Sequence, residues 1–375
     1  VVVLVTTKSG QGKLKVNYQG MWTAKKMGLF PERINSWEEA EMQNLARINA
    51  GQSPDWSAEL IALMKDPNQY YRINPTNPTA YQYFGNYNYP EILLKDKSTR
   101  LNQNLSISGS TEKDNYLFSL GYITDKGIFR FGPDDYKRLN GRFNYHRELS
   151  KMFSLDSKIL YSRSERNSSV LGASNDYGLI YNIVSSRSIS PIYLPESGDT
   201  KYAAGSAAGE TVGLLKDGGR NNNVIQEIGG SFELGAKDIF TEGLKLRLLY
   251  SPRIVMENDN NTRIPVPMYN VNGRTGWAGG INLNSIIKGR SQTLTNNWQA
   301  VGEYNRTFNE KHEVLVRGGY RYDDYRYDYI GASASNLPTD DVLALSQFGD
   351  KNNTSVGDNI QTNTLISFFG TAQYV

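Results

Sequence analysis

The most constraining feature of this sequence is the alternation of short and long connections between segments with a strand-like pattern. In chain order, the connections cover about residues 23–100 (long), 111–114 (short), 124–135 (medium), 149–151 (short), 164–223 (long), 237–242 (short), 257–291 (long), 309–311 (short) and 331–358 (long). Successive connections of an antiparallel sheet lie at opposite ends of its strands, so every long connection is expected at one end. Transmembrane β-barrels have short turns at one rim and long loops at the other, whereas a soluble sandwich has no physical reason for this arrangement.

The segments between these connections have the period-two alternation of strands with one apolar face. The clearest lies at 104–123, where Leu105 and Ile107 alternate with serines before a polar turn. Beyond the turn, four apolar side chains share one face: Tyr116, Phe118, Leu120 and Tyr122. About ten such strands can be counted, the first at 13–22 and the last at 362–375. The sequence therefore predicts an all-β chain that forms part of an antiparallel transmembrane β-barrel.

Charged residues predict which face of the strands meets lipid. A lipid-facing Arg at mid-depth costs roughly 2–4 kcal/mol, so charged strand residues must point to the lumen. Five arginines are expected to point to the lumen or the plug: Arg138, Arg142, Arg247, Arg317 and Arg321. An arginine near a rim, such as Arg321, could instead extend its charged end toward water. In the first long connection, residues 36–47 have the pattern of a helix, with Ser36 and Glu39 spaced as a capping box. The Tyr-rich stretch at 74–89 is expected to be irregular loop.

Composition excludes several classes of protein. The mean hydropathy is −0.54, and no apolar run approaches the roughly 18 residues of a membrane-spanning helix. The chain has 25 Tyr, 35 Gly and no Cys among its 375 residues, which fits an exported protein without disulfides. The net charge is +3 and no basic run is present, so no nucleic-acid partner is expected.

The first residues indicate a join between two domains. Residues 1–7 form a continuous run rich in Val, as in a strand buried on both faces, and a Ser-Gly-Gln-Gly break follows at 9–12. The sequence motif at 3–18, VLVTTKSG-x-G-x-x-x-V-x-Y, closely resembles that of the SusC/RagA family of TonB-dependent outer-membrane transporters. The segment NLSISGSTEKDNYLFSLGY, followed by DDYKRLNGRFN, resembles the same family over about forty residues (104–144).

This resemblance implies an architecture and a function. It implies that residues 1–12 end a plug domain and that 13–375 form the first part of the barrel, about ten of roughly 22 strands. The chain is accordingly expected to be an internal fragment of a protein in the Gram-negative outer membrane, surrounded by its lipid. The implied partners are a SusD-like surface lipoprotein and the TonB–ExbB–ExbD system, which would pull on a plug segment missing here. The implied cargo is an oligosaccharide or a peptide, imported without any covalent step.

The long loops contain the best ligand candidates. Trp277 and Tyr269 are aromatic residues in Gly-rich surroundings, and aromatic faces can stack on sugar rings. The alternative is that both residues pack the loops together or meet a partner protein. The stretches 170–181 and 202–212 are rich in small residues and are expected to be adaptable loop.

Enzyme and metal chemistry find little support in the sequence. His146 and His312 are far apart, whereas zinc binding needs clustered ligands. The cluster at 257–261 offers oxygen ligands, but it lacks the glycine and closing Glu of a calcium loop, so a solvated loop is favoured. We therefore expect no enzyme, cofactor or metal site.

Two other functions are compatible with a β-rich chain of this kind. One is a passive outer-membrane porin, against which the buried strand at 1–7 argues, because an open pore has no plug. The other is a secreted β-rich carbohydrate-binding protein, which would have turns of mixed length at both ends. In isolation, a partial barrel would expose open sheet edges and an apolar face, so this chain is expected to aggregate in water.

Overall fold

The computed structural model describes residues 12–28, 32–171, 176–347 and 351–375. One ten-stranded antiparallel sheet dominates it, and its strand order follows the chain. Its strands are β1 (Lys15–Lys25), β4 (Ser98–Ser110), β5 (Asp114–Lys126), β6 (Asp134–Glu148), β7 (Phe153–Ser169), β9 (Gly219–Lys237), β10 (Leu244–Arg263), β13 (Ser285–Phe308), β14 (His312–Ser335) and β15 (Thr354–Tyr374). The all-β prediction is confirmed, as is the number of strands. In the described part of the chain β1 and β15 are edge strands that do not pair with each other, as expected for part of a barrel.

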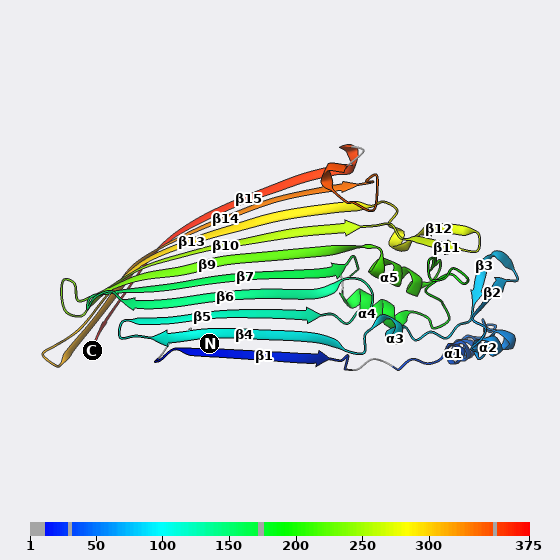
Figure 1. Ribbon diagram of the computed structural model, residues 1–375, viewed down its shortest axis with the longest axis horizontal. Coiled ribbons are helices and arrows are strands. Elements are labelled where there is room, and N and C mark those ends of the chain that lie inside the picture. The colour runs from blue at the N-terminus through cyan, green and yellow to red at the C-terminus, as the bar shows by residue number, and fades with distance from the viewer. Residues whose placement is uncertain (1–11, 29–31, 172–175, 348–350) are drawn as a thin grey trace.

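The short and long connections lie at opposite ends of this sheet, as predicted (Figure 1). The turn between β4 and β5 shows how hydrogen bonds close the short connections. The Thr111 amide donates to the Asp114 carbonyl at 2.8 Å, and the Thr111 hydroxyl accepts from the Asp114 amide at 3.0 Å. These bonds fix the register of the hairpin, because a turn of defined length leaves only one pairing.

One face of the sheet is apolar, and we call it the apolar face. The register places Ile107, Phe118, Phe143 and Ile159 side by side across four strands. A second row continues over the later strands with Tyr250, Trp298, Tyr322 and Ile366. Leu248 is 48% exposed and Phe368 78% exposed on this face. Such a continuous apolar surface is far larger than soluble monomers expose.

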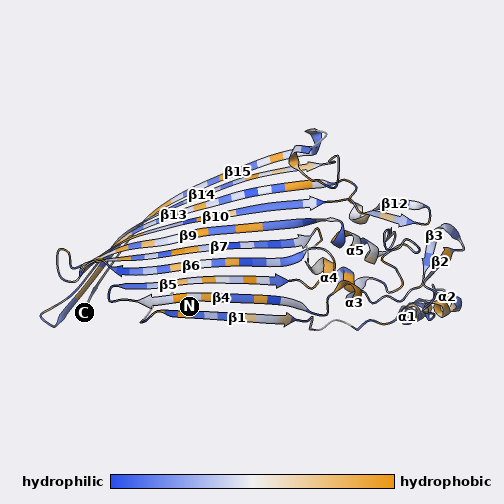
Figure 2. Cartoon of the chain, in the orientation of Figure 1, coloured by the Kyte–Doolittle hydropathy of each residue, from blue (hydrophilic) through white to orange (hydrophobic). Residues whose placement is uncertain are grey.

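The opposite face, here called the polar face, carries the charged residues. Because side chains alternate along each strand, the register places Arg138, Arg142, Arg247, Arg317 and Arg321 together on this face, as expected. Arg321 pairs with Asp323 at 2.7 Å, and Arg317 with Glu303 at 3.4 Å. Figure 2 shows the resulting alternation of hydrophilic and hydrophobic residues along the strands.

Most of the later strands extend further toward the loop end than the sequence predicts. β10 runs to Arg263, so the cluster at 257–261 belongs to a strand and not to a solvated loop. β13 begins at Ser285 and β14 continues to Ser335. In these extensions polar residues occupy both faces of the strand, as at 257–261, so the apolar alternation that identifies a strand is lost there.

The long connections contain small folded elements gathered at the loop end (Figure 1). They are α1 (Ser36–Asn49), α2 (Ala58–Met64), β2 (Tyr71–Asn74), β3 (Asn77–Tyr83), α3 (Tyr89–Leu93), α4 (Asp176–Ser185), β8 (Tyr202–Ala203), α5 (Ala207–Lys216), β11 (Pro267–Asn270), β12 (Gly273–Trp277) and the 3₁₀ turns η1 (Ala278–Gly280), η2 (Leu345–Gln347) and η3 (Lys351–Asn353). Of the helices that the structure describes, none has the length and apolar character needed to cross a membrane.

Two predictions for the first connection are wrong in detail. The N-cap of α1 is Asn35, not Ser36, and the capping box closes on Glu38, whose carboxylate accepts from the Asn35 amide at 2.7 Å. Asn caps helices as well as Ser does. Residues 74–83 of the Tyr-rich stretch belong to the β2–β3 hairpin rather than to irregular loop, and Tyr89 begins α3, whereas 84–88 is irregular as predicted. The Asn74 side chain shapes the turn of the hairpin by accepting from the Thr76 amide at 3.0 Å.

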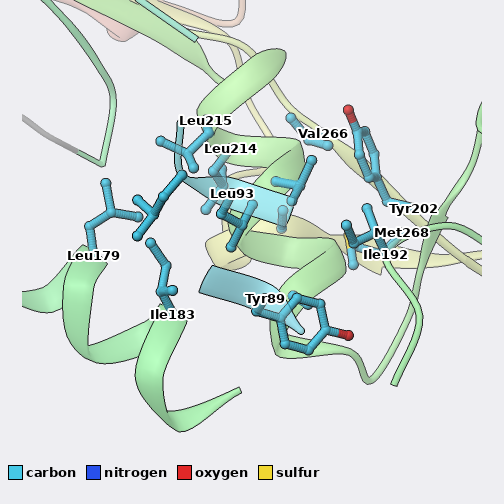
Figure 3. Packing of buried hydrophobic residues seen from close by; sticks show 14 residues of the cluster. Tyr89, Leu93, Leu179, Ile183, Ile192, Tyr202, Leu214, Leu215, Val266 and Met268 are labelled. Carbon is cyan, nitrogen blue, oxygen red and sulfur yellow. The ribbon is translucent and has the colours of Figure 1, made fainter. Parts of the chain in front are cut away.

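The largest hydrophobic core lies among the loop elements and not on the sheet. Leu179 and Ile183 of α4 pack with Leu93 of α3 and with Leu215 of α5 (Figure 3). The expectation of adaptable loop at 170–181 and 202–212 is therefore wrong over the part of these stretches that the structure describes. Small residues at 203–209 permit this packing, since Gly209 approaches the carbonyl of Ile192 too closely for a side chain. The resemblance assigns residues 1–12 to the plug, of which 1–11 lie outside the described residues, so that domain boundary stays a prediction.

Candidate functional site

The predicted ligand residues lie on a small three-stranded sheet at the loop end. β11 and β12 form an antiparallel hairpin, and β8 pairs with β11 in parallel. Asn270 shapes the turn by accepting from the Asn272 amide at 2.9 Å. Gly273 follows with φ +115°, a conformation that a side chain would strain. The sequence thus specifies the turn that brings β11 and β12 together.

The loop core holds this hairpin in place from behind. Met268 is buried with Tyr202 and Val266 in the cluster of Figure 3. The backbone after β12 is tied by Ala278, whose amide donates to the Val266 carbonyl at 2.8 Å. The Gly279 amide donates to the Glu210 carboxylate of α5 at 2.9 Å. A surface fixed by a packed core pays little ordering cost when it binds a ligand.

Tyr269 and Trp277 are both half-buried on this hairpin. Tyr269 lies directly opposite Arg274 across the two strands. The Arg274 guanidinium carbon is 4.5 Å from the centre of the Trp277 ring, and the Lys201 ammonium is 5.5 Å from the centre of the Tyr269 ring. The structure therefore places the two predicted aromatics on one hairpin, each with a cation beside its ring. This arrangement can hold a flat ring and can donate charge-assisted hydrogen bonds from its edge.

Arg274 and Lys201 are residues that the sequence reasoning missed. The dipeptide Asn272-Gly273 between two short segments is a strong hairpin signal, but with these two residues at the centre of the turn it would place Arg274 opposite Val271. The structure instead pairs Asn270 with Gly273 and, across a register shift, Tyr269 with Arg274. No local signal could have found Lys201, because it approaches Tyr269 from a loop far away in sequence.

A second aromatic surface lies on the β2–β3 hairpin. The rings of Tyr70 and Tyr71 are 5.0 Å apart, and those of Tyr71 and Tyr81 are 5.4 Å apart in an edge-on arrangement. A hydrogen bond to the Glu196 carboxylate, with a smaller contribution from burial, raises the pKa of Tyr71 to about 12. This bond ties the hairpin to the loop that follows β7.

The polar face carries shallow grooves lined by charge. One of about 240 Å³ lies near the turn end and is lined by His146, Glu233, Lys245 and Arg247, among others. His146 lies 3.0 Å from the Asp156 carboxylate, and His312 lies 2.6 Å from the Tyr374 hydroxyl. The two histidines occupy separate places near the turn end. Within the described ranges, no group of three or more His, Cys, Asp or Glu side chains is arranged to hold a metal ion.

Comparison with known proteins gives structural matches only. No protein-family model matches the chain, and no curated protein matches it. The solved structure of the RagAB peptide importer in the 'closed-closed' state matches with a TM-score of 0.72 at 15% identity, covering 98% of this chain and 41% of that chain. The same importer in the 'open-open' state and a structure of the RagAB peptide transporter match with the same TM-score and coverage at 16% identity.

The chain thus spans about 41% of the length of the chains that it matches. At this identity the likeness establishes the fold, which agrees with the family resemblance in the sequence. The chain has the fold of part of a SusC/RagA-type transporter.

Proposed function

We propose that this chain forms barrel wall and surface loops of a TonB-dependent importer of the SusC/RagA type in the outer membrane. The observation that carries the proposal is the separation of a mainly apolar from a mainly polar face on an antiparallel sheet whose long loops all lie at one end. The structural match to an importer supports it.

The height of the apolar face supports a membrane location. On β10, seven alternate positions from Leu244 to Met256 face this side, and Asn258 is the next. At about 3.4 Å per residue these positions span about 40 Å along the strand. A strand tilt of about 40° reduces this to about 30 Å, which is the hydrocarbon thickness of a bilayer.

The polar face would then line the lumen, where the plug of a TonB-dependent transporter resides. Its arginines and carboxylates suit a hydrated interior that must release the plug during transport. The coupling to TonB, ExbB and ExbD would act through that plug. The folded loops would form the outer surface on which a SusD-like lipoprotein sits.

Trp277 and Tyr269 are our candidates for ligand contact on this surface. The structures matched here are of a peptide importer, and the aromatic-cationic hairpin suits either a peptide with an acidic group or an oligosaccharide. The proposed function therefore includes the import of either a peptide or an oligosaccharide.

Import can be tested with the full-length protein in its native cell. We expect the protein in the outer-membrane fraction with a lipoprotein attached, and growth on one oligosaccharide or peptide source that requires both the transporter and TonB. A strain lacking TonB is the matched control. Uptake that continues without TonB would favour the porin, and recovery of intact protein in the soluble secreted fraction would favour the carbohydrate-binding protein.

A further inference from the structure

Charges along the loop-side border of the apolar face follow a regular pattern. On three strands, a cation on this face has a carboxylate two residues away on the same face. Lys137 pairs with Asp135 at 3.9 Å on β6, and Arg163 pairs with Glu165 at 3.1 Å on β7. On β14, Arg326 pairs with Asp328 at 2.7 Å. Each of these strands therefore crosses the border with little net charge.

On β13 the pattern is different, because the corresponding positions are Lys288 and Arg290. Both are exposed, and neither has a carboxylate partner among the described residues. Their cross-strand neighbours on β10 are Asn260 and Asn258, and those on β14 are Ala332 and Ile330. We call these six residues the cationic patch. It holds two positive charges and two amides, and none of its six residues is acidic.

The patch lies just beyond the apolar band. Leu294 is the last apolar residue of β13 on this face before Gln292, and Arg290 and Lys288 follow at alternate positions. At about 3.4 Å per residue and a tilt of about 40°, the two cations lie about 10–15 Å above Leu294. This is the depth of lipid headgroups, and long cationic side chains reach several ångströms along the surface.

We propose that Lys288 and Arg290 bind phosphate groups of the lipid leaflet at the loop end of the barrel. The inference rests on the proposed membrane location of the chain. Arg290 can hold a phosphate with two parallel hydrogen bonds, and Lys288 contributes a second compact charge. The Asn258 and Asn260 amides offer neutral donors beside them. Because the patch is on the apolar face, a substrate passing through the lumen does not meet it.

Acidic residues border the patch on two sides. On the apolar face, Asp328 lies diagonally beside Arg290 but is already paired with Arg326. Asp358 of β15 lies opposite Ile330 on the same face.

Two further acidic residues lie on the loop side. Asp340 and Asp341 line a groove of about 510 Å³ together with Asn260 and Arg220. The Asp340 carboxylate already accepts a hydrogen bond from the Asn284 amide at 2.7 Å. The lining of this groove also contains Lys216 and Asp217, so opposite charges meet on the loop side of the patch.

The test uses the full-length protein in a non-ionic detergent and lipid A, a glycolipid with two phosphates, as the probe. Binding is measured by native mass spectrometry against lipid A stripped of its phosphates. Each basic residue near an anionic lipid surface contributes about fivefold, so K288Q/R290Q should weaken binding of lipid A about 30-fold. K288E/R290E should weaken it further, and neither variant should alter the weak binding of the dephosphorylated lipid.

The control is K151E/K311E, which reverses two exposed cations in turns at the opposite end of the strands. Lipid A binding by this variant should equal that of the wild type. Heat-dependent electrophoretic mobility checks that every variant folds.

Equal binding by wild type and K288Q/R290Q would overturn the proposal, as would equal binding of both lipids to the wild type. Inhibition by inorganic phosphate at low concentration would show a free-phosphate site and would also overturn it. If one of these results is obtained while the protein is still found in the outer membrane, the lipid-binding proposal is wrong but the proposed function is unaffected. Absence from the outer membrane would instead defeat the proposed function.

Discussion

Adjacent leucines on β10 allow a direct test of the two faces. Leu248 is on the apolar face, 48% exposed, about 10 Å inside the turn-side border of the band. An Arg at this depth costs roughly 2–4 kcal/mol in lipid. Leu248→Arg should therefore lower the folded-to-unfolded ratio of the full-length protein by about 30- to 900-fold. If the face met water instead, the cost would be close to zero.

Leu249→Arg is the matched control, because it makes the same substitution one residue away on the polar face. Glu233 lies directly opposite it, so the new guanidinium gains an opposite-charge partner across the strands. The assay is chemical denaturation of the protein in lipid vesicles, followed by heat-dependent electrophoretic mobility. Equal destabilisation by the two substitutions, or a larger loss from Leu249→Arg, would refute the assignment of the faces.

Further predictions concern the loop end. Leu215→Ala should destabilise the loop core by about 2–5 kcal/mol, measured as faster hydrogen exchange at 176–218 with the sheet amides unchanged; unchanged exchange at 176–218 would contradict the role of this core. Burial, together with a 2.5 Å hydrogen bond from its hydroxyl to Asp217, raises the pKa of Tyr202. An unfolded Tyr ionises near pH 10, so the protonated form stabilises the loop core fully below that pH and its contribution is lost above it. Protease resistance of the loops should thus be constant from pH 7 to about 9 and fall above about 10, and Tyr202→Phe should flatten this fall; a loss near neutral pH would contradict it. Trp277→Ala should weaken binding of the imported oligosaccharide or peptide roughly tenfold, whereas Tyr70→Ala on the other hairpin should not; equal effects would show that the β11–β12 hairpin is not the contact.

The sheet could be predicted from the sequence because its signal is local. In 104–123, for instance, the alternation of Leu105 and Ile107 with serines sets the facing of β4, and the turn at Thr111 sets its pairing with β5. The alternation of turn lengths then orders all the strands. This reasoning stops where both faces of a strand become polar, as at 257–261 of β10.

The loop core could not be predicted, because its contacts join residues far apart in the chain. Leu93, Ile183, Leu215 and Met268 come from four separate elements, and no periodic pattern relates them. The candidate site likewise combines residues that could be predicted locally with one that depends on distant contacts. Its aromatics could be found by residue type, whereas the cation from Lys201 depends on the packing of β8 beside β11.

The most direct measurement of the central claim is the solvent accessibility of spin labels along β10 in lipid vesicles. This chain contains no cysteine, so single labels can be placed at each position from 244 to 260 without competing sites in it. We predict that even positions up to 256 collide with oxygen dissolved in the lipid, that odd positions collide with a water-soluble nickel complex, and that even positions become water-accessible from 258. Equal water accessibility of odd and even positions across 244–256 would contradict the membrane account.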